Sequence, residues 1–267
     1  MVGAPRTGRG AMSRTQLTKD AWLAALRSDA TALRAAAGNE GVLGNQVPSC
    51  PGWTMGELIR HVGSIYQWVS ATAGRGTTDK PHPREIGPEV PEADDPTVLG
   101  WFDEQLGLIL AFLDNLDPDL PAWNWAPQAR KAGFWHRRMA HETAIHRWDA
   151  QLSVGLTEPI ETKLAGDTIA EVLDTWLPAG RRRETPDVHG LVHLVAADLG
   201  QEWYVRLRGA GIALLDTNTL LDDDSHPARA AASGNASDVA LALWGRLNWD
   251  VLDTAGDDTL LTTLHVA

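Results

Sequence analysis

The segment FWHRRMAHETAIHRWDAQLSVG, residues 134–155, carries the pattern on which both the fold and the site depend. We predict that it forms one long helix ending at Gly155, because a glycine in the left-handed conformation commonly stops a helix. Glu142 and His146 are four residues apart within it. A helix places side chains at this spacing on the same face, one turn apart, where they can share one cation.

The segment VPSCPGWTMGELIRHVGSIYQWV, residues 47–69, predicts a second helix. Thr54 and Glu57 have the spacing of a capping box, in which each side chain bonds a backbone N–H at the start of the helix. We therefore expect the helix to run from about residue 55 to 73. His61 lies on it, shortly after two apolar residues that should face the core.

Two more helices complete a predicted bundle. Apolar residues recur every three or four positions over residues 15–37, and Pro96, with Asp95 as its cap, opens a helix over 96–116. Four helices joined by loops predict an up-down four-helix bundle. A fifth helix is predicted near residues 160–176.

The pattern changes after about residue 178, where short alternating stretches predict strands and a small α+β unit. In the stretch EWYVRLRG, Trp203, Val205 and Leu207 should face the core. Strands are expected at 191–197, 202–209 and 212–216, and helices at 237–247 and 257–264. The predicted parts of this α+β chain are a disordered lead-in (1–14), the helix bundle (15–178), a linker (179–190) and a C-terminal α+β domain (191–267).

Composition limits the partners and the location. The formal charge of −12 argues against nucleic acid, because phosphate binding needs a dense basic surface. Cys50 is the only cysteine, which excludes an intramolecular disulfide and fits a reducing cytoplasm. No stretch approaches the roughly 18 apolar residues of a membrane span. We expect a cytoplasmic protein with a small-molecule partner, without a membrane, nucleic-acid or obligate protein partner.

A third ligand would complete a metal site with Glu142 and His146. His61 is the strongest candidate, because neighbouring helices of a bundle can bring it close. The sequence HETAIH does not match the zincin motif, since His141 and His146 are five residues apart, about 140° around a helix. Glu142 is therefore better interpreted as a ligand than as a zincin base. Two imidazoles and one carboxylate leave tetrahedral zinc an open fourth position, which is typical of a catalytic site.

Simpler interpretations stay open at each position. A histidine in an apolar helix, such as His61, is usually a core or half-exposed side chain. Glu142 and His146 equally fit a solvated surface pair. Four other histidines are alternative ligands, although each better fits a surface, capping or strand position: His136, His141, His189 and His193.

The two quoted motifs resemble a known family. PSCPGWTMGELIRHVG (48–63) and WHRRMAHETAIHRWDAQ (135–151) are similar to the mycothiol-dependent maleylpyruvate isomerase family, a branch of the DinB-like metal-binding bundles. The likeness runs over about residues 17–153. It continues more loosely over 191–267, which looks like the family's small C-terminal domain of sterol-carrier-like form.

The resemblance implies a chemistry. His61, Glu142 and His146 match the family's ligands for a divalent metal, zinc by expectation, and mycothiol, the small thiol of actinobacteria, is the implied cosubstrate. Coordination to a cation deprotonates a thiol, whose pKa is about 8.5 in water, so the thiol would react as a metal-bound thiolate. It would add to an electrophilic small molecule, either for cis-trans isomerisation of a maleylpyruvate-type substrate or for thiol S-transfer.

Two functions from other classes stay open. One is a noncatalytic small-ligand-binding protein, in which the metal stabilises the bundle and a fourth protein ligand closes its coordination sphere. The other is a metal-dependent hydrolase, which needs a general base near the metal.

Arg246 matches an arginine of the family, and we predict that it is catalytic, gripping a substrate carboxylate with its planar guanidinium. The alternative is that it ends a helix and interacts with the helix dipole. Asp149, three residues after His146, is expected either to orient that histidine or to form a surface salt bridge. We expect Trp53 to pack at the end of the bundle, and Cys50 has no evident activating partner.

Overall fold

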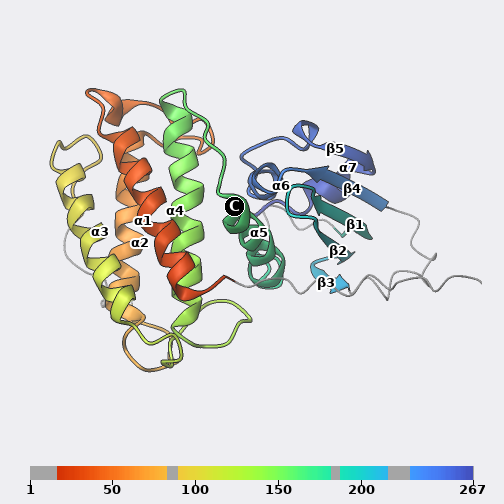
Figure 1. Ribbon diagram of the computed structural model, residues 1–267, viewed down its shortest axis with the longest axis horizontal. Coiled ribbons are helices and arrows are strands. Elements are labelled where there is room, and N and C mark those ends of the chain that lie inside the picture. Colours follow the sequence, from red (N-terminus) through yellow and green to blue (C-terminus); the bar gives the residue numbers. More distant parts are fainter. Residues whose placement is uncertain (1–16, 83–89, 182–186, 216–228, 267) are drawn as a thin grey trace, which may run out of the picture.

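The computed structural model describes residues 17–82, 90–181, 187–215 and 229–266. The fold is α+β, as predicted: long helices form one part and a five-stranded sheet covered by short helices forms the other (Figure 1). The predicted lead-in over residues 1–14 lies outside the described residues.

Four long helices lie side by side in the first part (Figure 1). Helix α1 packs mainly against α4, and α2 mainly against α3. Their shared core contains large, fully buried side chains such as Leu26, Tyr66, Phe102 and Met139. The helices are α1 (Lys19–Ala37), α2 (Met55–Thr72), α3 (Val98–Asn115) and α4 (Gly133–Ser153), with a 3-10 turn at Val42–Gly44.

The predicted start of α2 is confirmed. The hydroxyl of Thr54 accepts a hydrogen bond from the Glu57 N–H at 3.3 Å, and the Glu57 carboxylate accepts one from the Thr54 N–H at 2.6 Å. The predicted stop of α4 is also confirmed, because Gly155 has a φ of 78°. Helix α3 begins later than predicted. Asp95 accepts bonds from the N–H and hydroxyl of Thr97, both at 2.8 Å, so a turn precedes the helix.

The second part begins with α5 (Thr162–Glu171), which continues into a π-helical turn (Val172–Trp176). The sheet order is β3-β2-β1-β4-β5, in which β1 and β4 are parallel and the other neighbours antiparallel. The remaining elements are β1 (His189–Ala196), β2 (Gln201–Arg208), β3 (Gly211–Leu215), β4 (Arg229–Gly234), α6 (Ala236–Leu243), a 3-10 turn (Trp249–Val251), β5 (Asp253–Gly256) and α7 (Asp258–Thr262).

One face of the sheet is buried. Trp203, Val205 and Leu207 of β2 are at most 1% exposed, which confirms the predicted alternation. Successive residues of a strand point to opposite faces, so these three share the inner face with Val192, Leu194 and Ala196 of β1.

Helix α5 lies between the bundle and the sheet (Figure 1). It packs against α6, and its Ile169 shares one apolar core with Ile145 and Trp148 of α4 and with Trp203 of β2. The two parts therefore have a continuous interior at this junction. The predicted division of the chain at residues 179–190 stays a prediction.

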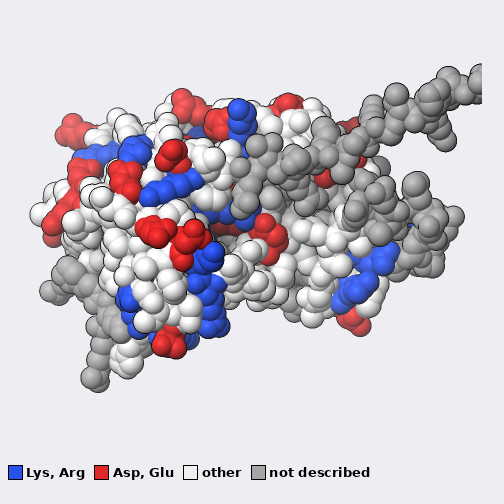
Figure 2. Space-filling model, turned by 60° about the horizontal axis from the view of Figure 1, so that its bottom comes forward, with Lys and Arg blue, Asp and Glu red and all other residues white. Residues whose placement is uncertain are grey.

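Charges are mixed on the surface. On the face shown in Figure 2, Lys and Arg lie beside Asp and Glu across the described residues. None of the helices in the described ranges is both long and apolar enough to cross a bilayer.

Candidate metal centre and pocket

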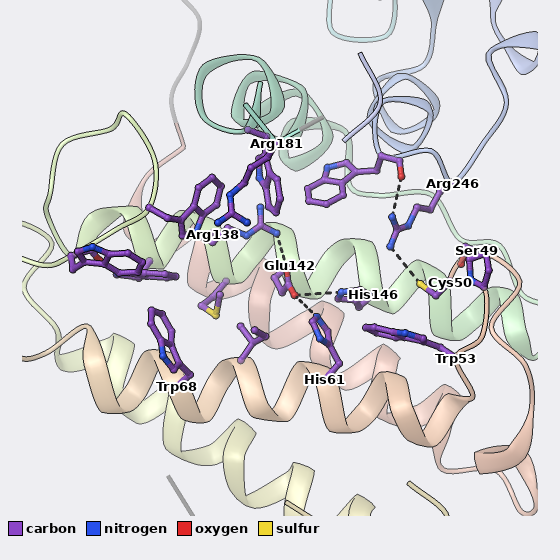
Figure 3. Close-up of a pocket in the computed structure, with 18 residues that line it drawn as sticks. Ser49, Cys50, Trp53, His61, Trp68, Arg138, Glu142, His146, Arg181 and Arg246 are labelled. Atoms are coloured by element: carbon purple, nitrogen blue, oxygen red, sulfur yellow. Dashed lines mark hydrogen bonds and ion pairs between the residues drawn. The ribbon is translucent and has the colours of Figure 1, made fainter. Parts of the chain in front are cut away.

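His61, Glu142 and His146 converge at one point between α2 and α4 (Figure 3). The Nε2 atom of His61 lies 3.0 Å from Oε1 of Glu142, and Nε2 of His146 lies 3.4 Å from the same oxygen. One ligand atom from each residue lies within 4.8 Å of the others. The capping box starts α2 before His61, and the four-residue spacing on α4 supplies the other two side chains.

The centre is set into the protein. The side chains of Glu142 and His146 are 12% and 9% exposed, whereas that of His61 is 32% exposed. Trp53 covers the two imidazoles, with its ring centroid 4.8 Å from that of His61 and 6.3 Å from that of His146. Trp53 is thus part of the site as well as of the end of the bundle.

A buried arginine holds the second oxygen of Glu142. Arg138, one turn earlier on α4, donates from Nη2 to Oε2 at 2.9 Å and also pairs with Glu171 of α5. Burial alone would raise the pKa of Glu142, but hydrogen bonds from His146 and His61 and the charge of Arg138 lower it well below its usual value. Glu142 is therefore a fixed carboxylate with one oxygen left for the centre.

Asp149 holds the other side of the centre. Its carboxylate accepts a bond from Nδ1 of His146 at 2.9 Å and one from the Ser49 hydroxyl at 2.6 Å. Arg246 donates to both of its oxygens, from Nε at 3.1 Å and from Nη2 at 3.0 Å. Burial alone would raise the pKa of Asp149. The charge of Arg246 and the hydrogen bond with His146 outweigh this effect and hold the pKa well below its ordinary value.

Asp149 in turn raises the pKa of His146 and orients its ring. Burial would lower the pKa of His146, but hydrogen bonds with Asp149, Cys50 and Glu142 raise it well above its ordinary value. The bond at Nδ1 directs Nε2 toward Glu142 and His61, which is how ligand histidines are usually oriented.

Cys50 is a pocket residue that sequence reasoning did not assign to the site. Its Sγ lies 3.4 Å from Oδ2 of Asp149 and 3.5 Å from Nη2 of Arg246. Cys50, His146 and Asp149 form a second group whose potential ligand atoms lie within 4.8 Å of one another. In the sequence, only the position of PSC (48–50) shortly before the α2 cap could have pointed to Cys50 as a site residue. Whether this segment approaches α4 depends on how the loop before α2 folds.

A pocket of about 710 Å³ opens over the centre (Figure 3). Arg246 belongs to the segment after α6, so the C-terminal part forms one wall. The guanidinium groups that line the pocket are those of Arg138, Arg181 and Arg246. Most of the remaining wall is aromatic, formed by Trp53, Trp68, Trp123, Trp125, Trp135, Trp176 and Trp244.

The alternative histidines lie elsewhere. His136 is buried against the carbonyl oxygens of Ala132 and Leu113, and burial lowers its pKa. His141 bonds Asp167 and Thr168 of α5. The remaining two are on β1, where they bond nearby carboxylates: His189 to Asp187 and His193 to Glu202.

The three converging side chains suit a divalent cation. Imidazole nitrogens and a carboxylate oxygen are ligands that zinc accepts, and three protein ligands leave a position open. The observed hydrogen bonds support this fit, because Asp149 and Arg138 each hold a ligand from behind and direct its remaining donor atom inward.

The chain was compared with known proteins by sequence and by structure, and both comparisons find the same kind of protein. The sequence profile of the mycothiol maleylpyruvate isomerase N-terminal domain matches residues 14–151, just over half of the chain. A crystal structure of the mycothiol-dependent maleylpyruvate isomerase superposes with a TM-score of 0.62 at 13% identity, covering 92% of this chain and 96% of that one. A histidine-to-alanine variant of that enzyme superposes with a TM-score of 0.61 at 12% identity, with the same coverage. At these identities the likeness establishes the fold. No curated protein sequence is significantly similar to the chain.

Proposed function

The chain belongs to the family defined by the mycothiol maleylpyruvate isomerase N-terminal domain, and we propose on this premise that it is a metal- and mycothiol-dependent enzyme. It acts on an electrophilic small molecule, by maleylpyruvate-type cis-trans isomerisation or by thiol S-transfer. The observation that carries the proposal is the convergence of His61, Glu142 and His146 at the base of an open pocket.

In this proposal, the site holds one divalent cation, zinc by preference. Its ligands are Nε2 of His61, Nε2 of His146 and a carboxylate oxygen of Glu142. A cation bound there supplies Lewis acidity, which lowers the pKa of a thiol into the physiological range. Asp149 keeps the Nδ1 proton on His146, so that Nε2 is available as a ligand. Arg138 holds the outer oxygen of Glu142, so that its carboxylate cannot turn away.

The pocket walls position the reactants and limit water. At about 710 Å³, the pocket has room for a large polar thiol beside a small electrophile. In isomerisation the thiol sulfur, as thiolate, adds to one carbon of a conjugated cis double bond. The π electron pair of that bond moves to its second carbon, where the adjoining conjugated group stabilises it. The resulting single bond rotates, and expulsion of the thiol restores the double bond as trans. In S-transfer the carbon that holds the electron pair instead takes up the proton that the thiol lost, and the reaction stops at the thioether.

Arg246 stays a predicted functional residue. Two of its nitrogens bond Asp149, and its side chain is only 11% exposed. This pairing favours a positioning role, in which Arg246 holds Asp149 and through it His146, over a direct grip on a substrate carboxylate.

We also propose a cytoplasmic location, because a reduced thiol cosubstrate and a free Cys50 both suit a reducing compartment.

The test compares His146→Ala with the control His193→Ala, which changes a histidine on β1 outside the pocket. We expect His146→Ala to lose stoichiometric metal and activity while its circular dichroism stays largely helical, whereas the control keeps both. Full zinc occupancy in His146→Ala would contradict the ligand assignment.

The same proteins are incubated with mycothiol and a panel of cis-enones and other electrophiles, with and without chelator. A trans product with recovered thiol identifies an isomerase, and an accumulating thioether identifies an S-transferase. Turnover without thiol would instead indicate a hydrolase. A protein that binds metal but converts nothing would support the noncatalytic alternative.

A further inference from the structure

Two of the three pocket arginines are already neutralised. Arg138 pairs with glutamates of α4 and α5, and its side chain is 4% exposed. Arg246 is paired with Asp149. Arg181 differs, because it is exposed and no carboxylate in residues 17–82, 90–181, 187–215 or 229–266 forms an ion pair with it. Among the three arginines that line the pocket, Arg181 is therefore the one whose guanidinium no described carboxylate neutralises.

Backbone hydrogen bonds fix the point from which the Arg181 side chain extends. The helix that contains the π-helical turn ends in a Schellman motif: the Gly180 N–H bonds the Leu177 carbonyl at 3.0 Å, and the Arg181 N–H bonds the Trp176 carbonyl at 3.1 Å. The motif needs a left-handed residue, and Gly180 supplies it with a φ of 71°. Arg181 thus turns back over the last turn of the helix.

The side chain of Arg181 is held as well. Its guanidinium carbon lies 4.1 Å from the ring centroid of Trp125 and 5.7 Å from that of Trp176. Stacking uses the face of the guanidinium and leaves its N–H edge free for hydrogen bonds. In Figure 3, Arg181 and Arg246 both lie above the His61, Glu142 and His146 centre, Arg181 toward the left and Arg246 toward the right beside Cys50.

We propose that Arg181 is a specificity-determining residue that binds a carboxylate of the electrophilic substrate. This inference rests on the proposed function, because it assigns a group to the substrate of that site. A carboxylate matches the free edge of a guanidinium with two parallel hydrogen bonds. The two tryptophans limit the motion of the side chain, so less conformational entropy is lost on binding. A neutral substrate of the same shape would gain nothing from Arg181.

The test is isothermal titration calorimetry with succinate, an unreactive dicarboxylate, and with dimethyl succinate, its neutral ester. Zinc-loaded protein is titrated, and the titration is repeated after chelation to separate binding through the cation. Arg181→Gln removes the charge and Arg181→Lys keeps it without the planar fork. Arg130→Gln is the matched control, because Arg130 is an exposed arginine on the loop that carries Trp125 and does not line the pocket.

We expect wild type to bind succinate more tightly than the ester, and Arg181→Gln to weaken succinate binding about tenfold without changing ester binding. Arg181→Lys should fall between the two, and Arg130→Gln should match wild type. Unchanged succinate affinity in Arg181→Gln, an equal loss in Arg130→Gln, or a wild type without preference for succinate would each overturn the proposal.

The outcome is separate from that of the proposed function. Succinate selectivity that depends on Arg181, in a protein without mycothiol-dependent turnover, would reject the enzyme assignment and keep the carboxylate site. Turnover with mycothiol that is insensitive to Arg181 in both KM and kcat, together with unchanged succinate binding, would keep the enzyme and reject the role of Arg181.

Discussion

Asp149 joins three distant stretches of chain at a single carboxylate: the Ser49 loop, His146 of α4 and Arg246 after α6. We predict that Asp149→Asn lowers the affinity for zinc roughly 10–100-fold, because an amide cannot keep both the Nδ1 bond and the arginine pairing. Competition with a zinc-binding dye measures the affinity. The exposed Asp103→Asn, which breaks only a surface pair with Arg34, is the control. Equal affinity in both variants would remove Asp149 from the site.

The residues of the centre differ in how far sequence could predict them. The spacing of Glu142 and His146 requires only that α4 be helical. His61 could be proposed because the capping box sets the start of α2. Cys50 and Trp53 could not be assigned, since both lie on a loop whose path depends on tertiary contacts, such as the bond from the Ser49 hydroxyl to Asp149 of α4 at 2.6 Å.

At the scale of the element, the start of α2 determines where His61 lies. We predict that Thr54→Ala lowers the free energy of unfolding by about 1 kcal/mol, because the Glu57 N–H loses its acceptor. Urea denaturation measures the loss. Thr31→Ala, at an exposed position within α1, should change stability by less than about 0.5 kcal/mol. A Thr54→Ala protein as stable as wild type would show that the cap contributes nothing measurable.

Elements with a strong periodic pattern were predicted within a few residues, and weak patterns were not. Strands β4 and β5 escaped prediction because RAAASG and DTAG contain almost none of the β-branched and aromatic residues that mark strands. They form because β4 pairs with β1 in the middle of the sheet. The π-helical turn after α5 was not predicted either, since its sequence continues a helical pattern and its bonding is set by packing.

At the scale of the whole molecule, Asp167 of α5 connects the bundle to the second part. It accepts a bond from Trp22 of α1 at 2.7 Å and one from His141 of α4 at 3.1 Å, and it pairs with Arg137 at 3.0 Å. Burial would raise the pKa of Asp167, but the His141 hydrogen bond and the charges of His141 and Arg137 lower it below its ordinary value.

We predict that Asp167→Ala lowers the free energy of unfolding by about 3–5 kcal/mol near neutral pH, because the buried Trp22 N–H and His141 lose their partner and Arg137 keeps only its ion pair with Asp174. A depressed carboxyl pKa stabilises the fold above the unfolded value of about 3.9, and this contribution disappears as pH falls through the folded value. The difference between variant and wild type should therefore be constant above about pH 4 and shrink below it. Denaturant melts across this range measure it, and a difference that grows on acidification would contradict the assignment.

A cation held by His61 of α2 and by Glu142 and His146 of α4 would also stabilise the whole fold, because the unfolded chain does not present these ligands together. We predict that chelation lowers the Tm of wild type. At a free zinc concentration 100 times Kd, the stabilisation is about 2.7 kcal/mol. His146→Ala should melt at the same temperature with and without chelator. An equal response of the two proteins in differential scanning calorimetry would place the stabilising metal elsewhere.

Seven of the twelve tryptophans line the pocket that contains Arg138, Arg181 and Arg246, above the candidate metal centre. More than half of the indoles that can fluoresce therefore lie in the walls of this pocket. Any thiol, metal or acid that enters changes the polarity and the quenching around these indoles, so occupancy can be followed in real time without a label.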